Sequence, residues 1–426
     1  MFSLPYNKKW IDVFIPEKNI VRIITPRKIN PIVNLPQAIN NALEKPVDNL
    51  SFDSFLQKGD RVVIIVSDIT RYTGAELFLP YLINRINRRG ISDKKVSIVF
   101  SLGIHRPMTF KEQKMIVGDE IVDRIRMENH SLKNDNQLIS LGKTKRGTPV
   151  IINRRVAEAD KIILTGTLGF HYLAGFGGGR KSIIPGVAAY DTCVANHLLV
   201  LDPVKSGRHP QARAGNLKGN PMHEDMMEAG RFLPPSFLFN TILSPDYGIL
   251  SLVVGNWEKA FYRGCQFVDQ YFKVPIPQKA DLVIASCGGF PKDINFIQAH
   301  KTLDYAMNAL KPGGVMILVA ACPEGLGHPD FLSWLRFREL SEMESELRNN
   351  FQINGQTAYA TLLKAKRANI FLLSELPDSI VRSMSMTPVH SIEEALSKAY
   401  QLLGENPSTY VIPNGSVTLP WIEEES

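Results

Sequence analysis

The 426-residue chain has only four cysteines, and they are far apart in the sequence. Cys193, Cys265, Cys287 and Cys322 form no CxxC pair, which excludes a dense disulfide framework and a zinc knuckle. Such sparse thiols are typical of a protein from a reducing compartment. We therefore expect the fold to be held by a hydrophobic core, for which a chain of this length has ample material.

Long apolar runs are also missing. The longest, near residues 62–66 and 315–322, have the length of β-strands and fall well short of the roughly 20 residues that a membrane-spanning helix needs. The first ten residues, MFSLPYNKKW, contain no apolar segment of the kind found in secretory signals. We therefore expect a cytoplasmic protein without a membrane partner.

A strong charge of one sign is absent as well. The 49 Lys+Arg against 42 Asp+Glu leave a formal net charge of +7. Basic runs, at residues 85–89 and 143–146, are short, whereas nucleic-acid-binding proteins usually gather their charge in a patch or arm. A mildly basic protein suits an anionic small molecule or a phosphate-bearing cofactor. We expect no nucleic-acid partner, and a nucleotide- or nucleic-acid-binding protein remains the alternative from another class.

The sequence does contain strand-like runs that alternate with helix-like stretches. Three buried strands are predicted in the first half, at residues 61–66, 96–100 and 161–165. Capping boxes, Thr73 with Glu76 and Thr109 with Glu112, open the helices that follow the first two strands. Near-continuous apolar strands separated by amphipathic helices are typical of a parallel sheet covered on both faces.

The alternation restarts after residue 272. Strands are predicted at 281–286, 315–320 and 369–373, and helices at 295–310 and from Ser391. Between the halves, KVPIPQKA (273–280) contains two prolines and predicts a hinge. We therefore expect an α/β protein of two domains, each with a mostly parallel sheet flanked by helices. Residues 1–272 would form the first and 273–405 the second, with the tail 406–426 returning to the first. Ligands of such sheets bind beyond the carboxyl ends of the strands, so the active site is expected in the interdomain crevice.

The segment GFGGGRKS (175–182) is the strongest local signal. It nearly fits the P-loop pattern GxxxxGK[ST], but Arg180 stands in place of the second required glycine. Pro185 and Gly186 follow where a phosphate-binding helix would form. A P-loop and a plain glycine-rich turn both stay open. The interpretation we favour is a backbone that approaches a ligand closely, with Arg and Lys supplied to it.

Polar residues follow the predicted strands. Asp68 and Arg71 follow the first strand, His105 the second and His171 the third, and His197 lies downstream. No HExxH or HxH spacing is present, so spacing alone specifies no metal site. Imidazole exchanges protons near neutrality, so His105 and His171 could serve two faces of one substrate, with a structural role as the alternative for each.

Two further polar residues lie on a predicted helix of the second domain. Gln298 and Lys301 are three residues apart and therefore share a helix face. Facing the crevice, they would suit a small anion, and facing solvent is the alternative. Arg71 could likewise hold a carboxylate or phosphate bidentately, and Asp68 could cap a helix or bind a ribose hydroxyl.

Together these segments resemble the nickel-dependent lactate racemase family. The matching pieces follow one another in order and spacing over nearly the whole chain: SDITR (67–71), GIHRP (103–107), GFHYLAGFGGGRKSIIPG (169–186), ANH (195–197) and GGFPKDINFIQAHK (288–301). The resemblance implies a two-domain α/β enzyme with a nickel-pincer nucleotide. This cofactor is a Ni(II)-pyridinium-3,5-bisthiocarboxylate mononucleotide that holds nickel through one carbon and two sulfur atoms.

The resemblance also implies a role for each matching residue. Lys181 would form the covalent thioamide tether to the cofactor, and His197 would be the protein ligand to nickel. His105 and His171 would be the two proton donors and acceptors. The remaining matches would line the cofactor (Asp68, Ile69, Thr70 and Arg71) or bind the substrate (Arg71, and Gln298 and Lys301 at its carboxylate).

The implied activity is that of an isomerase, a racemase or epimerase of a small 2-hydroxycarboxylate, with lactate as the default substrate. Malate, phenyllactate and aldonates are the alternative substrates. The Cα hydrogen of such an acid is a poor acid, because its loss would place a second negative charge beside the carboxylate. Hydride transfer to the cofactor avoids this. One histidine takes the hydroxyl proton, and hydride then returns to the other face of the 2-keto acid while the opposite histidine delivers a proton. Cofactor-maturation proteins are implied as partners.

Overall fold

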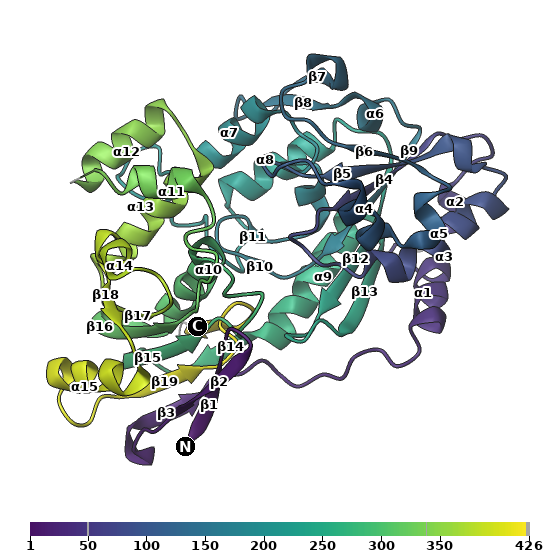
Figure 1. Ribbon diagram of the computed structural model, residues 1–426. Helices are drawn as coiled ribbons and strands as arrows, with labels where there is room; N and C mark the ends of the chain where they lie inside the picture. Colours follow the sequence, from purple (N-terminus) through teal and green to yellow (C-terminus); the bar gives the residue numbers. More distant parts are fainter. Residues whose placement is uncertain (49–50, 338, 423–426) are drawn as a thin grey trace. The chain divides into compact units, whose positions relative to one another are not determined.

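The computed structural model describes residues 1–48, 51–337 and 339–422, and the chain divides into two compact units. Unit 2 comprises Ile29–Val200 and Gln211–Asp269. Unit 1 comprises Met1–Lys28, Leu201–Pro210 and the chain from Gln270 onward. Each unit is built on one six-stranded sheet, and both sheets are labelled in Figure 1.

The sheet of unit 2 has the strand order β13-β12-β9-β4-β5-β6. Its members are β13 (Ile249–Asn256), β12 (Ser236–Leu243), β9 (Lys161–Thr167), β4 (Val62–Ser67), β5 (Val96–Ser101) and β6 (Arg126–Asn129). All neighbours are parallel except the β12–β13 hairpin pair. The mostly parallel α/β sheet predicted from the apolar runs is thereby confirmed.

Both faces of this sheet are buried. On β4, Val62, Ile64 and Val66 belong to a hydrophobic cluster that includes the apolar faces of the helices α1 and α3. Val63 and Ile65 alternate with them and are buried on the opposite face. The helices of unit 2 are α1 (Leu35–Glu44), α2 (Phe52–Phe55), α3 (Ala75–Arg88), α4 (Phe110–Val117), α5 (Asp119–Val122), α6 (Arg154–Ala157), α7 (Tyr190–Leu198), α8 (Pro221–Gly230) and most of α9 (Trp257–Phe272).

Two small hairpins complete unit 2. They are β7 (Leu138–Lys143) with β8 (Pro149–Asn153), and β10 (Phe170–His171) with β11 (Gly175–Phe176). The second hairpin follows β9 and ends at the 3-10 helix η4 (Gly179–Ser182). It therefore carries the glycine-rich segment away from the end of a central strand.

The sheet of unit 1 is parallel throughout and has the order β18-β17-β16-β15-β19-β3. Its strands are β18 (Thr387–Val389), β17 (Asn369–Leu373), β16 (Leu310–Val319), β15 (Ala280–Ser286), β19 (Thr409–Ile412) and β3 (Ile20–Ile23). The helices of this unit are α10 (Phe296–Ala306), α11 (Pro329–Trp334), α12 (Leu340–Asn349), α13 (Ile353–Ala365), α14 (Asp378–Ser383) and α15 (Ile392–Leu403).

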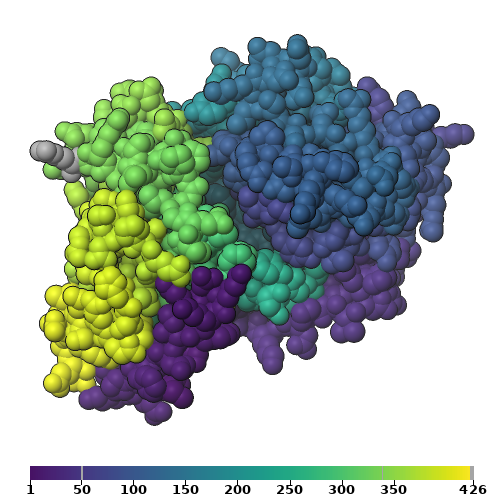
Figure 2. All heavy atoms as spheres, in the orientation of Figure 1, coloured from purple at the N-terminus to yellow at the C-terminus, as the bar shows by residue number. Residues whose placement is uncertain are grey.

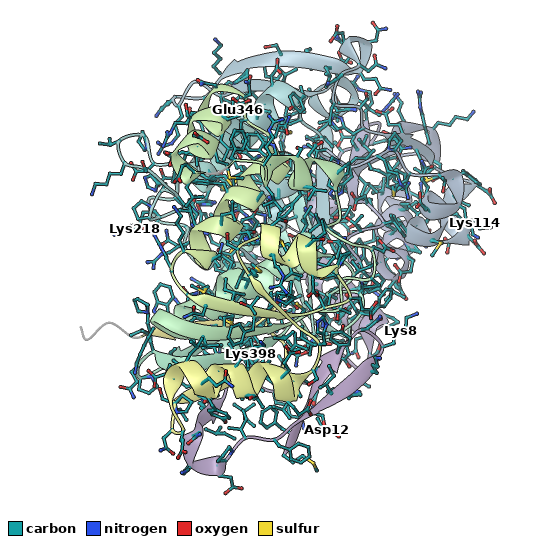
Figure 3. The ribbon with its side chains drawn as sticks, turned by 60° about the vertical axis from the view of Figure 1, so that its left-hand side comes forward. Lys8, Asp12, Lys114, Lys218, Glu346 and Lys398 are labelled. Carbon is teal, nitrogen blue, oxygen red and sulfur yellow. The ribbon has the colours of Figure 1, made fainter. Side chains whose placement is uncertain are left out.

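A hairpin of the first residues packs on this second sheet. β1 (Phe2–Tyr6) pairs with β2 (Lys9–Val13), and Leu4 and Val13 share one hydrophobic cluster with Ile392 and Leu396 of α15. Figure 3 shows the hairpin near α15, where Asp12 and Lys398 are labelled. Residues from the N-terminal and C-terminal parts of the sequence therefore share the hydrophobic core of unit 1.

The division of the chain differs from the predicted one at both termini. We expected residues 1–272 to form one domain and the tail 406–426 to return to it. Instead, β19 of the tail pairs with β15, and β3 of the N-terminal segment extends the same sheet. Figure 2 shows N-terminal atoms (purple) beside C-terminal ones (yellow). Such short strands have weak sequence signals, because their partners alone decide which sheet they join.

Two local predictions also need correction. Helix α3 begins after Gly74, which has a left-handed backbone (φ 72°), and Thr73 makes no side-chain cap. The predicted hinge contains a strand instead, since β14 (Lys273–Ile276) pairs with β20 (Leu419–Ile422). The capping box of Thr109 and Glu112 on α4 is confirmed. In the described chain, no helix has the length and apolar character needed to cross a membrane.

Candidate active site

Three predicted site residues of unit 2 follow neighbouring strands of its sheet. Strands β9, β4 and β5 are adjacent and parallel, and the last residues of β4 and β5, Ser67 and Ser101, pair directly. The chain continues from these strands into Asp68 and His105, and from β9 into His171. The carboxyl ends of neighbouring parallel strands meet at one edge, which is where such sheets bind ligands.

Asp68 and His105 form a hydrogen-bonded pair at this edge. His105 Nδ1 lies 2.5 Å from Oδ2 of Asp68, whose side chain is 4% exposed. Thr70 donates its hydroxyl to the other carboxylate oxygen at 2.6 Å. Burial raises the pKa of Asp68, but the hydrogen bond and charge of His105 and the charge of Arg71 outweigh burial and hold that pKa below its usual value. An ionised Asp68 binds the Nδ1 hydrogen of His105 and thereby leaves the lone pair on Nε2.

His171 is held in the opposite way. Its Nδ1 accepts hydrogen bonds from the backbone N–H groups of Leu173 (3.3 Å) and Ala174 (3.1 Å). A nitrogen that accepts two hydrogen bonds carries no hydrogen of its own, so a neutral ring has its hydrogen on Nε2. The two histidines therefore have opposite tautomers: Nε2 is an acceptor in His105 and a donor in His171.

His197 and Lys181 form a second group in this unit. His197, on α7, donates Nδ1–H to the carbonyl oxygen of Cys193 at 2.7 Å, which leaves the Nε2 lone pair as its ligand atom. Burial and the nearby charge of Lys181 lower the pKa of His197 to about 3, so the ring stays neutral. The Lys181 side chain is itself buried, at 5% exposure. Burial raises the pKa of the Cys193 thiol to about 12, although the charge of Lys181 acts in the opposite direction.

This donor set fits a metal held mainly by a cofactor. A neutral imidazole that donates its other N–H to a carbonyl is the usual state of a histidine metal ligand. Among the described residues, no three His, Cys, Asp or Glu side chains gather as a metal site. His197 therefore has the state that a protein ligand to a cofactor-held metal would need.

The glycine-rich segment packs tightly against other parts of the protein, as the alternative of a glycine-rich turn predicts, while its approach to a ligand stays a prediction. A Cβ on Gly178 would lie 2.6 Å from Asn240 Oδ1, and one on Gly179 would lie 2.7 Å from the Phe261 ring. Asn240 accepts the N–H of Gly179 at 2.9 Å. Sequence reasoning missed Asn240, although a polar residue within the apolar run FLFNTIL (237–243) is a signal of this role.

Arg180 does not have the position that we expected. It is fully buried and lies 4.2 Å over the Phe261 ring, so it is not a cation presented to a ligand. Arg180 lies in the short 3-10 helix η4, which is not followed directly by the α-helix that a P-loop requires. A buried arginine and a buried lysine also argue against this segment as a nucleic-acid-binding surface.

Gln298 and Lys301 belong to unit 1. Both lie on α10, in its first two turns, and Lys301 Nζ donates to Gln298 Oε1 at 2.6 Å. The side chain of Asn295 caps the helix by accepting the N–H of Gln298 at 3.0 Å. The predicted shared face is therefore observed, and an amide beside an ammonium group can receive a carboxylate.

His223 gives unit 2 a predicted pH dependence. It accepts a hydrogen bond from Arg180 Nε at 3.1 Å, and burial, with the charges of Arg180 and Arg231, lowers its pKa to about 3. The unfolded chain binds a proton here below pH 6.5, while the folded chain does not, so acid favours unfolding by up to about 1.4 kcal/mol per pH unit. Urea denaturation at about pH 7 and pH 5 measures how much unfolding free energy each protein loses on acidification. We expect this loss to be about 2 kcal/mol smaller in His223→Gln than in the parent protein. Equal losses would contradict this assignment.

Two family models match the chain. The lactate racemase N-terminal domain covers residues 6–208, and the lactate racemase C-terminal domain covers residues 276–419. The chain is 30% identical to the lactate racemase of Thermoanaerobacterium thermosaccharolyticum and 31% identical to that of Lactiplantibacillus plantarum. Both alignments span 97% of this chain, and 97% and 98% of the two relatives.

Solved structures agree with the sequence matches. The lactate racemase apoprotein from Thermoanaerobacterium thermosaccharolyticum superposes with a TM-score of 0.90 at 28% identity and covers 99% of each chain. A Thermotoga maritima protein shares the fold alone, with a TM-score of 0.67 at 17% identity over 91% of this chain and 98% of that one. Fold and matches together define a two-domain α/β isomerase. The chain belongs to the lactate racemase family.

Proposed function

We propose that this protein racemises a 2-hydroxy acid, with lactate as the default substrate, by reversible hydride transfer to a nickel-pincer nucleotide. The observation that carries the proposal is the pairing of His105 with the buried carboxylate of Asp68 at 2.5 Å. It leaves the Nε2 lone pair of His105 to accept a hydroxyl proton, and the negative charge stabilises the imidazolium that forms. The relatives' printed name supports lactate as the substrate.

His171 is the second histidine that the proposed reaction needs. In the proposed reaction one histidine takes the hydroxyl proton of the substrate and the other supplies a proton on the opposite face. His171 follows β9, the neighbour of β4 in the sheet. Its neutral ring would donate the Nε2–H as a hydrogen bond to the substrate oxygen, where negative charge develops as hydride returns. Arg71, Gln298 and Lys301 remain the predicted partners of the substrate and its carboxylate.

His197 and Lys181 are the residues that would hold the cofactor. When bound, the nickel-pincer nucleotide would supply the hydride acceptor. His197 would coordinate nickel through Nε2, since its Nδ1–H is held by Cys193. Lys181 would provide the tethering amine, and Asp68, Ile69, Thr70 and Arg71 would line the nucleotide.

The activity can be tested with single enantiomers. Cofactor-loaded protein should racemise lactate, followed by chiral chromatography, with malate, phenyllactate and an aldonate as competing substrates. In D₂O, hydride transfer keeps the original hydrogen at Cα, whereas removal of Cα–H as a proton would introduce deuterium. Loaded protein that racemises none of these acids would refute the proposal, and turnover of another acid alone would replace lactate as the substrate.

Replacing Lys181 should abolish covalent attachment of the cofactor. Lys181→Ala removes the only atoms that the proposed thioamide could use, so intact-protein mass spectrometry after cofactor loading should show the unmodified mass. Lys161→Ala, at the start of β9, is the matched control and should retain the adduct. An adduct on Lys181→Ala would contradict the tether.

A further inference from the structure

Arg180 is the largest fully buried side chain in the described molecule. No carboxylate pairs with it among the residues that the structure describes, and burial lowers its pKa to about 10. A guanidinium in such a place is costly unless its hydrogen bonds are satisfied. The partners of this arginine therefore indicate what it does for the fold.

Those partners are mainly carbonyl oxygens of one turn. Arg180 donates through Nη2 to Ala174 O at 2.6 Å, and through Nη1 to Phe176 O at 2.9 Å and Gly177 O at 3.4 Å. Its Nε donates to His223. The planar fork thus fixes the turn 174–177 from one side, as a bidentate group can and a point charge cannot.

The same turn determines the state of His171. Ala174 gives its carbonyl to Arg180 and its N–H to His171 Nδ1, so one peptide segment connects the two side chains. Gly175 then pairs with His171 across the β10–β11 hairpin. Displacing the turn would remove the N–H donors that keep hydrogen off Nδ1.

We propose that Arg180 is a positioning residue that fixes the ring orientation and tautomer of His171 by holding the turn 174–177. The catalytic meaning of this inference rests on the proposed function, in which His171 exchanges a proton with the substrate. The effect of Arg180 on the tautomer of His171 does not depend on the proposed function, because it can be measured in the protein without cofactor.

The test reads the tautomer directly. In protein with ¹⁵N-labelled histidine, NMR shifts distinguish a protonated from an unprotonated ring nitrogen, and His171→Gln identifies the signals. We expect an unprotonated Nδ1 in the parent protein. In Arg180→Lys the tautomer ratio should fall on the order of tenfold, which is the effect of losing aligned N–H donors. His223→Gln is the control, because glutamine can still accept from Arg180 Nε, and the His171 signals should stay as in the parent protein.

Two outcomes would overturn the proposal: hydrogen on Nδ1 of His171 in the parent protein, or an unchanged ratio in folded Arg180→Lys. If that variant does not fold, Phe261→Leu removes the ring under Arg180 and should move the ratio in the same direction, and an unchanged ratio there would refute the proposal. In cofactor-loaded enzyme, Arg180→Lys should lower kcat with little change in KM. A parent enzyme without racemase activity would refute the proposed function alone, since the NMR result stands separately.

Discussion

Alanine at either His105 or His171 is expected to reduce racemisation of both enantiomers by roughly 10²- to 10⁴-fold. Each turnover removes a hydroxyl proton on one side and returns one on the other, so neither direction can proceed with one histidine alone. Chiral chromatography of reactions started from each pure enantiomer measures both rates. The loss should appear mainly in kcat, because neither imidazole is assigned to the carboxylate.

Two further variants distinguish the loss of a catalytic histidine from a general effect of substitution on the enzyme. His390→Ala removes an imidazole that is 70% exposed and should leave both rates unchanged. Asp68→Asn keeps the shape of the partner of His105 but removes its charge, and should lower kcat for both enantiomers. Full activity of either His105→Ala or His171→Ala would refute the proposed pairing of the two histidines.

Asp304→Asn is expected to lower the free energy of unfolding by about 3–5 kcal/mol. Asp304 lies 2.8 Å from Lys364 and 2.9 Å from Arg208, and the side chains of Asp304 and Lys364 are only 4% and 10% exposed. Burial alone would raise the pKa of Asp304, but the charges of Arg208 and Lys364 keep it well below its usual range. Asparagine would leave Lys364 buried without a counter-charge.

Urea denaturation of the two proteins measures this effect, and the same substitution at an exposed site provides its control. Asp378→Asn breaks an ion pair with Arg382, with side chains 42% and 65% exposed, and should change stability by less than about 1 kcal/mol. If both substitutions cost the same, the cluster around Asp304 does not stabilise unit 1 as proposed. Arg208 comes from the inserted segment 201–210, so this cluster also joins that segment to the unit.

Local pattern was enough for the central strands and for bringing Asp68 and His105 together. The apolar runs at 62–66 and 96–100 become neighbouring strands, and Asp68 and His105 follow their ends. A parallel sheet then brings those ends together without further information. The short strands β3 and β19 were different, because they contain few residues and the sheet that they join depends on partners far away in the sequence.

The sequence alone determined the alternation of strands and helices, the order of the chemical residues after the strands, and the family, since these depend on residues near each other in the chain. Tertiary structure decided which way individual side chains and hydrogens point. Arg180, beside Lys181 in the sequence, turns into the core because the carbonyls of Ala174 and Phe176 and the ring of Phe261 surround it. The opposite tautomers of His105 and His171 likewise depend on a carboxylate in one case and on amide hydrogens in the other, and only folding places those partners against each ring.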